Sequence, residues 1–146
     1  MDAVVVDIDI AASPEQVWDV IMDPTRLDDW VTIHRRLGRH DAPFGEGATM
    51  EQTLCLRGMN FKVKWTVVEW DPPHRAVMEG RGPARSKARI VDELSRRDGK
   101  THFDYRNEFK APMGPLGSVA GRVLVGGVSE REAQASLNRL KALLER

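Results

Sequence analysis

The sequence has little cysteine and contains no long apolar run. Cys55 is the single cysteine among 146 residues, which excludes an intramolecular disulfide and a thiolate metal cluster. No apolar segment approaches the roughly 18 residues that a membrane-spanning helix needs. The first residues include Asp2, Asp7 and Asp9 and no basic leader, so we expect neither a secretion signal nor a membrane anchor. These absences favour a cytoplasmic protein.

Net charge is absent as well, because 22 Lys and Arg residues balance 22 Asp and Glu residues. Long-range attraction to nucleic acid or to an anionic membrane is therefore not favoured. Arg85, Lys87 and Arg89 alternate along one predicted strand, and a solvated outer face of a sheet is the simpler interpretation of that pattern.

The sequence offers no clear cofactor motif. Its four histidines show neither a helical metal-binding pair nor a nearby cluster of acidic ligands, so we predict no metal site. The glycine-rich stretch GPLGSVAGR lacks the Gly-Lys-Ser/Thr ending that grips phosphates. We therefore expect neither a metal nor a nucleotide cofactor.

Hydrophobic periodicity predicts an α+β chain, and the length fits a single domain over residues 1–146. Apolar residues alternate over 4–10, which predicts a strand. Two short helices follow, in SPEQVWDVIM and DPTRLDDW, each begun by a capping residue and a proline. Between 33 and 111, strand-length runs are separated by turns too short for a parallel crossover, so the strands must be antiparallel.

The last part of the chain, from GPLGSVAGR to KALLER, has apolar residues at helical spacing and predicts one helix of roughly 30 residues. It is the only predicted element long enough to cover one face of the sheet. Gly126 and Gly127 fall near its middle, where each costs about 0.8–1 kcal/mol relative to alanine. We interpret the pair as making room, either for close backbone packing or for a hollow between helix and sheet.

Two segments carry a resemblance to a known family. ASPEQVWDVIMDPTRLDDW resembles the strand exit and helix pair of the START-like, or SRPBCC, superfamily, and VKWTVVEWDPPHRAVMEG resembles its recurrent strand, Asp-Pro-Pro turn and strand. WVTIHRR with LRGMNFKVKWTVVEWDPP is similar to an actinobacterial subgroup that includes a mycobacterial toxin of a type II toxin–antitoxin pair. The resemblance covers essentially the whole chain. It implies the helix-grip fold, a curved antiparallel sheet wrapped around a long C-terminal helix, with an apolar cavity that holds a hydrophobic small molecule.

Candidate ligand-binding residues come from the period of two along the predicted strands, which separates an inward face from an outward one. In THFDYRNEF the inward set mixes aromatic and polar side chains. The strand candidates are Met50, Gln52, Leu54, Phe61, Trp65, Phe103, Tyr105, Asn107 and Phe109. Trp30 and Ile33, at the expected cavity mouth, and Val123 and Gly127, in the last helix, complete the set.

Polar residues on inward faces distinguish a binding site from an ordinary core. An amide or phenol buried without a partner costs about 1–3 kcal/mol, so Gln52, Tyr105 and Asn107 need a ligand, a water molecule or one another as partners. We hypothesise that these three orient a ligand. His34 lies close to the expected cavity mouth and is interpreted as a surface or rim histidine, with a gate or a general base as the alternative.

The first functional hypothesis is binding of a hydrophobic or amphipathic small molecule, lipid or polyketide-like, without metal or nucleotide cofactor. The alternative is an enzyme of the aromatase/cyclase kind in which Tyr105, His34 or Gln52 shuttles protons, although no catalytic residue is secure. A third reading, which depends only on the subgroup resemblance, is a toxin or protein-interaction role in which the surface contacts a protein partner.

Overall fold

The computed structural model describes residues 2–110 and 128–146. Val123, Gly126 and Gly127, which the sequence places in its last helix, lie outside these residues.

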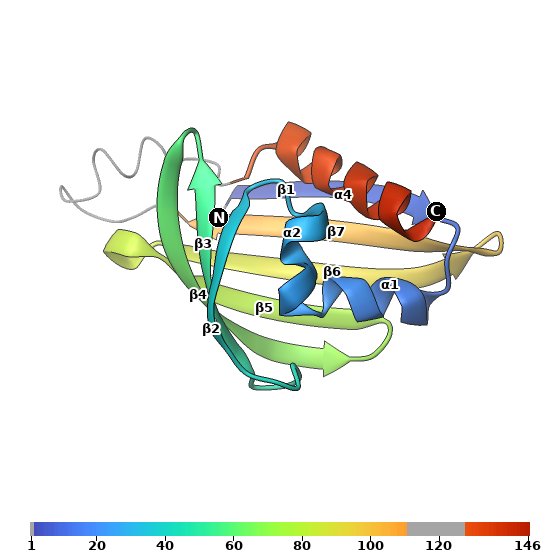
Figure 1. The fold of residues 1–146 in the computed structure, drawn as a ribbon, viewed down its shortest axis with the longest axis horizontal. Helices are drawn as coiled ribbons and strands as arrows, with labels where there is room; N and C mark the ends of the chain where they lie inside the picture. The colour runs from blue at the N-terminus through green and yellow to red at the C-terminus, as the bar shows by residue number, and fades with distance from the viewer. Residues whose placement is uncertain (1, 111–127) are drawn as a thin grey trace.

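One antiparallel sheet forms the body of the described chain, with the strand order β1-β7-β6-β5-β4-β3-β2 (Figure 1). From β2 to β7 each strand pairs with the next along the sequence, and β1 pairs with β7. The predicted antiparallel arrangement is thus confirmed. The strands are β1 (Asp2–Ile10), β2 (His34–His40), β3 (Thr49–Leu56), β4 (Met59–Asp71), β5 (Arg75–Arg81), β6 (Lys87–Arg97) and β7 (Lys100–Lys110).

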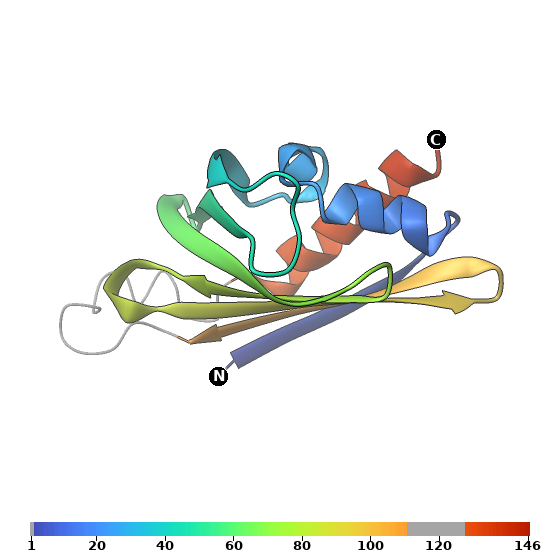
Figure 2. The ribbon, with the colours of Figure 1, turned by 90° about the horizontal axis from the view of Figure 1, so that it is seen from below.

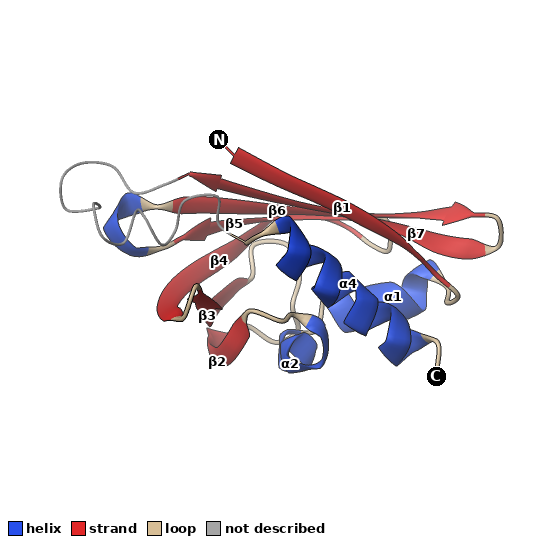
Figure 3. Ribbon diagram, turned by 90° about the horizontal axis from the view of Figure 1, so that it is seen from above, coloured by secondary structure: helices blue, strands red, loops and turns tan. Residues whose placement is uncertain are grey.

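The helices cover one face of this sheet. Helix α1 (Pro14–Ile21), the 3₁₀ turn η1 (Pro24–Arg26) and helix α2 (Leu27–Trp30) follow β1, the 3₁₀ turn η2 (Pro83–Arg85) joins β5 to β6, and helix α4 (Glu130–Leu144) ends the described chain. Figures 2 and 3 show α1, α2 and α4 on the same side of the sheet, with β2 and β3 curling toward α2. The opposite face carries no helix of the described residues.

The start of α1 follows from its sequence. The Ser13 hydroxyl accepts a hydrogen bond from the Gln16 backbone N–H at 3.2 Å, and the Gln16 side-chain oxygen accepts one from the Ser13 backbone N–H at 2.9 Å. This capping box satisfies two backbone donors that a helix start leaves free. It confirms the predicted helix start immediately after the first strand.

Helix α4 is shorter than the predicted C-terminal helix. It begins at Glu130 because Ser129 adopts extended backbone angles and its hydroxyl accepts a hydrogen bond from the Glu132 N–H. The expectation of one continuous helix through the two glycines is therefore wrong at residues 128 and 129. Serine is a strong helix N-cap, and that signal was overlooked in the sequence.

The two halves of α4 have different surroundings. Leu137 and Leu140 are completely buried in one cluster with Ile10 and Phe103, which fixes this half of the helix against the sheet. Ala133 and Ser136, in the first half, instead line a cavity. No helix among the described residues has both the length and the apolar character needed to cross a lipid bilayer.

Candidate functional site

A mainly apolar cavity of about 90 Å³ lies between the inner face of the sheet and helices α2 and α4. Since about 10–15 Å³ by this measure accommodates one water molecule, the space fits several waters or a molecule of one or two rings. Ten of the predicted binding residues line it: Trp30, Ile33, Met50, Gln52, Leu54, Phe61, Trp65, Tyr105, Asn107 and Phe109. The period of two therefore predicted the eight strand residues of this wall, and the family resemblance predicted Trp30 and Ile33.

Three other predicted residues are not in this wall. Phe103 is 0% exposed and does not line the cavity. It pairs across the sheet with Ile8 and Leu94, at the end where α4 is packed into the core, so its place in the predicted cavity was wrong. Val123 and Gly127 lie outside the described residues.

A glycine within the sheet leaves space for the Trp65 ring in the cavity wall. Gly80 on β5 stands opposite Trp65 on β4. A Cβ atom at Gly80 would lie 2.7 Å from Trp65 ring carbons and 2.8 Å from a Val63 methyl group, far inside van der Waals contact. Gly80 is thus a glycine that makes room for a cavity-lining side chain.

We expect Gly80→Ala to lower the free energy of unfolding by about 1–3 kcal/mol, because the added methyl group forces Trp65 or the backbone to move. Urea unfolding followed by tryptophan fluorescence measures this loss. Gly45→Ala is the matched control, since a Cβ there meets no atom within 4 Å. Equal stabilities of the two variants would show that Trp65 does not depend on Gly80.

Trp65 begins a chain of buried hydrogen bonds. Its Nε1–H donates to Gln52 Oε1 at 2.8 Å, and the Gln52 amide nitrogen lies 2.8 Å from His34 Nδ1. Because the amide nitrogen only donates, His34 Nδ1 must accept, which leaves the ring proton on Nε2. That nitrogen is 3.6 Å from Asp28 Oδ1, on a side chain that is 80% exposed. The amide of Gln52 is therefore already engaged by protein groups on both of its ends.

His34 is buried rather than exposed, so its interpretation as a surface or rim histidine was wrong. Its exposed fraction is 6%, and the bond from Gln52, eighteen residues away, accounts for its inward position. Burial lowers the pKa of His34, and the Asp28 carboxylate opposes that shift. A neutral ring is what the hydrogen bond from Gln52 requires.

Three buried polar atoms of residues around Tyr105, which we call the polar end of the cavity, have no partner within hydrogen-bond distance among the described residues. They are Trp30 Nε1, Asp92 Oδ1 and Asn107 Nδ2, and their residues all line the cavity. Tyr105 lies among them, with its ring 5.7 Å from the Trp30 ring and its backbone directly opposite Asp92. Such atoms are rare in folded proteins and call for an explanation.

Asp92 is the residue that the sequence analysis missed. It is 3% exposed, and burial raises the pKa of its carboxyl to about 8. Burial, with the nearby Asp92 carboxyl as a second cause, also raises the pKa of Tyr105, and a side-chain hydrogen bond with Asn107 opposes that rise. The sequence could have revealed it, because Ile90, Asp92 and Leu94 alternate in IVDELS and so point to the same inward face of the strand. A carboxylate between two apolar residues on such a face is unexpected.

A hydrogen bond joins the segment after α2 to α4 near the cavity. The Thr32 backbone N–H donates to Ser136 Oγ at 3.0 Å, and the same hydroxyl donates to the Glu132 carbonyl oxygen at 3.1 Å. These contacts fix the positions of Trp30 and Ile33, which flank this segment, relative to the cavity-lining half of α4.

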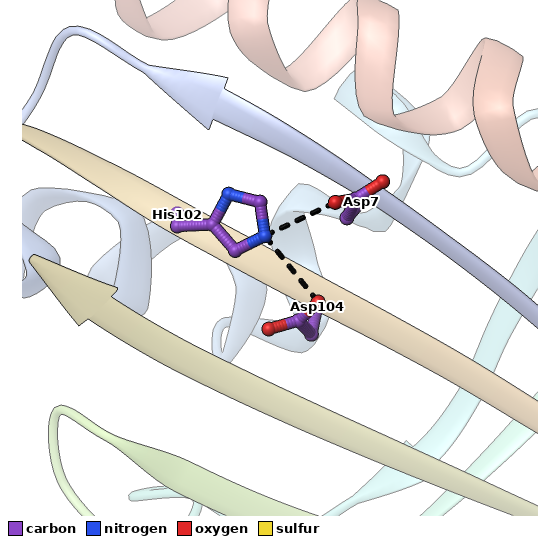
Figure 4. A group of neighbouring side chains, drawn as sticks. All are labelled: Asp7, His102 and Asp104. Atoms are coloured by element: carbon purple, nitrogen blue, oxygen red, sulfur yellow. Dashed lines mark ion pairs between the residues drawn. The ribbon is translucent and has the colours of Figure 1, made fainter. Parts of the chain in front are cut away.

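A second group of titratable residues lies on strands β1 and β7 (Figure 4). His102 Nδ1 donates to Asp9 Oδ1 at 2.6 Å, and Nε2 lies 3.1 Å from Asp7 Oδ2 and 3.4 Å from Asp104 Oδ1. The hydrogen bond from His102 lowers the pKa of Asp9. The expectation that no histidine lies near acidic side chains was wrong, because strand pairing brings β1 beside β7.

Asp7, His102 and Asp104 offer one ligand atom each within 4.8 Å of one another, so this group has the geometry to hold a metal ion. Both nitrogens of His102 already face carboxylates of the protein, and these contacts tie β1 to β7. The absence of a metal site remains a prediction.

A curved antiparallel sheet that holds a C-terminal helix over an apolar cavity defines the helix-grip class. Within that class, the chain belongs to the family described as polyketide cyclase / dehydrase and lipid transport, whose model matches residues 1–145. The START-like resemblance is thereby confirmed.

Two mycobacterial proteins are similar to the chain in sequence, and a solved structure shares its fold. The uncharacterized protein Rv1546 of Mycobacterium tuberculosis is 32% identical over 134 residues, covering 89% of this chain and 93% of its own. Toxin Rv0910 of the same organism is 28% identical over 127 residues, covering 84% and 88%. The crystal structure of CV1439 from Chromobacterium violaceum shares the fold with a TM-score of 0.72 at 18% identity, covering 100% of this chain and 99% of its own.

Proposed function

We propose that this protein, as one domain over residues 1–146, binds a hydrophobic or amphipathic small molecule in the cavity between sheet and helices. The observation that carries the proposal is an apolar cavity wall with unpartnered polar atoms at one end, the usual composition of a small-molecule site. Family membership supports the same class of ligand. A cytoplasmic location remains part of the proposal.

Native mass spectrometry of the purified protein tests this function, followed by organic extraction and identification of any compound released. We expect a stoichiometric adduct with an apolar compound. A protein that keeps its unliganded mass, including after incubation with fatty acids and aromatic polyketides, would contradict the proposal. That result would move a protein-partner role, raised by the 28% identity to Toxin Rv0910, to first place.

An enzyme of the cyclase or dehydratase type is the second candidate, and Asp92 is the observation that favours it. A buried carboxyl with a pKa of about 8, beside the Tyr105 phenol in the cavity, suits general acid–base chemistry near neutral pH. His34 and Gln52 suit it less, because each is engaged in the hydrogen-bond chain with Trp65. Turnover of an added poly-ketone by the wild-type protein, lost in Asp92→Asn, would support the enzyme.

A further inference from the structure

We propose that Asp92, Asn107 and Trp30 form a hydrogen-bonding subsite for a neutral hydroxyl group on a compact ring-shaped ligand, and that this subsite discriminates against carboxylates. The inference rests on the proposed function, since it names the class of molecule that the same cavity takes.

The free donors and acceptors of the three residues match those of a hydroxyl group. Asn107 Nδ2 carries two N–H groups, one of which is shared with Tyr105, and Trp30 Nε1 carries one, whereas Asp92 Oδ1 is an oxygen able to accept. A hydroxyl group has one proton to donate and two lone pairs to accept with, so it complements one acceptor and two donors. A ketone lacks the proton, and a carboxylate lacks it and adds a negative charge.

The three residues are grouped around Tyr105. Asp92 stands opposite Tyr105 on the neighbouring strand, Asn107 is two residues along from Tyr105 on the same face, and the Trp30 ring packs against the Tyr105 ring. The subsite therefore surrounds a single phenol on the inner face of the sheet. By contrast, the Gln52 amide at the other polar position has both of its ends occupied by Trp65 and His34.

The charged residues that line the cavity do not favour a ligand carboxylate. Lys87 and Glu108 also contribute to the lining, but Lys87 is exposed, and Glu108 is held by Arg89 and Arg106 at 3.2 and 3.0 Å. No cation among the described residues is paired with Asp92. A ligand carboxylate at the polar end would thus be buried without a compensating positive charge, which is costly.

Three probes with the same two-ring skeleton test the subsite: 2-naphthol, naphthalene and 2-naphthoate, titrated into the wild-type protein at pH 7. We expect the Kd for 2-naphthol to be at least tenfold lower than that for either of the other two. Asn107→Leu should raise the Kd for 2-naphthol about tenfold and leave that for naphthalene within twofold. Trp30→Phe should act in the same direction, so the test survives if one variant fails to fold.

Met78→Leu is the matched control, because Met78 lines the cavity and the change conserves apolar volume. It should alter the two Kd values, for 2-naphthol and naphthalene, by the same factor. Equal affinity of the wild-type protein for these two probes would overturn the subsite, as would tighter binding of 2-naphthoate. If no probe binds while an apolar compound is extracted from the purified protein, the subsite is wrong and the proposed function stands; if no compound is found either, both fail.

Discussion

Replacement of Phe103 by alanine is expected to lower the free energy of unfolding by about 3–5 kcal/mol, the range for deletion of a fully buried aromatic ring. The ring is 0% exposed and its centroid lies 6.3 Å from that of Trp30 and 5.5 Å from that of Tyr105. Its loss therefore removes apolar burial and leaves a hole beneath two cavity-lining aromatics. Equilibrium unfolding in urea gives the free energy directly, provided that the slope with urea is unchanged.

Phe109→Ala is the natural comparison on the same strand and the same face. Phe109 is only partly buried and lines the cavity, so its removal enlarges an existing space rather than opening a new one. We expect a loss less than half that of Phe103→Ala. If Phe103→Ala costs no more than Phe109→Ala, then Phe103 does not belong to the core.

The order of elements could be predicted because local chemistry determines it. Alternation identified the inward face of β3, β4 and β7, and Ser13 with Gln16 identified the start of α1. Short turns were enough to require antiparallel strands. These features depend on residues that are close together in the sequence, so they can be recognised without the structure.

The predictions that were wrong concern contacts between residues that are distant in the sequence. His34 is buried because Gln52, on the neighbouring strand, donates to its ring. His102 meets Asp7 and Asp9 only because β1 returns to pair with β7. Gly80 makes room for Trp65 in the cavity wall, and this can be recognised only when β5 is aligned with β4.

The candidate site was predicted more fully in its apolar wall than in its polar chemistry. Eight of the cavity residues follow from the period of two, and Trp30 and Ile33 from the family resemblance, yet the amide proposed to hold a ligand, that of Gln52, is occupied by protein groups. The ligand-binding role of Asn107 stays a prediction, and the structure adds Asp92 as a second candidate. Whether a buried polar atom has a partner is a property of the packed structure, which periodicity does not contain.

Asp92 makes the stability of the protein depend on pH in an unusual direction. The ordinary pKa of an aspartate carboxyl is 3.8, whereas the pKa of Asp92 in the folded protein is about 8, because burial disfavours its charged form. Between these values the native state holds one proton more than the unfolded state. The free energy of unfolding therefore falls by about 1.4 kcal/mol for each unit of pH increase in this window, and the contribution levels off above about pH 8.

Asp92→Asn removes this titration and keeps the shape of the side chain. Relative to the variant, the wild-type protein should lose about 3 kcal/mol of stability between pH 5 and pH 7.5, measured by urea unfolding at each pH. Glu93→Gln is the control, since its carboxylate is 53% exposed and pairs with Arg75; that variant should keep the wild-type decline.

Parallel pH profiles for the wild-type protein and Asp92→Asn would mean that Asp92 is ionised throughout this range. A fixed negative charge would then lie in the cavity beside Tyr105, and a positively charged ligand would be favoured over a neutral hydroxyl. The predicted decline would instead establish a neutral carboxyl at physiological pH, able both to donate a hydrogen bond and to accept one. Because stability can be measured without any ligand, this experiment determines the charge at the polar end of the cavity independently of what the cavity binds.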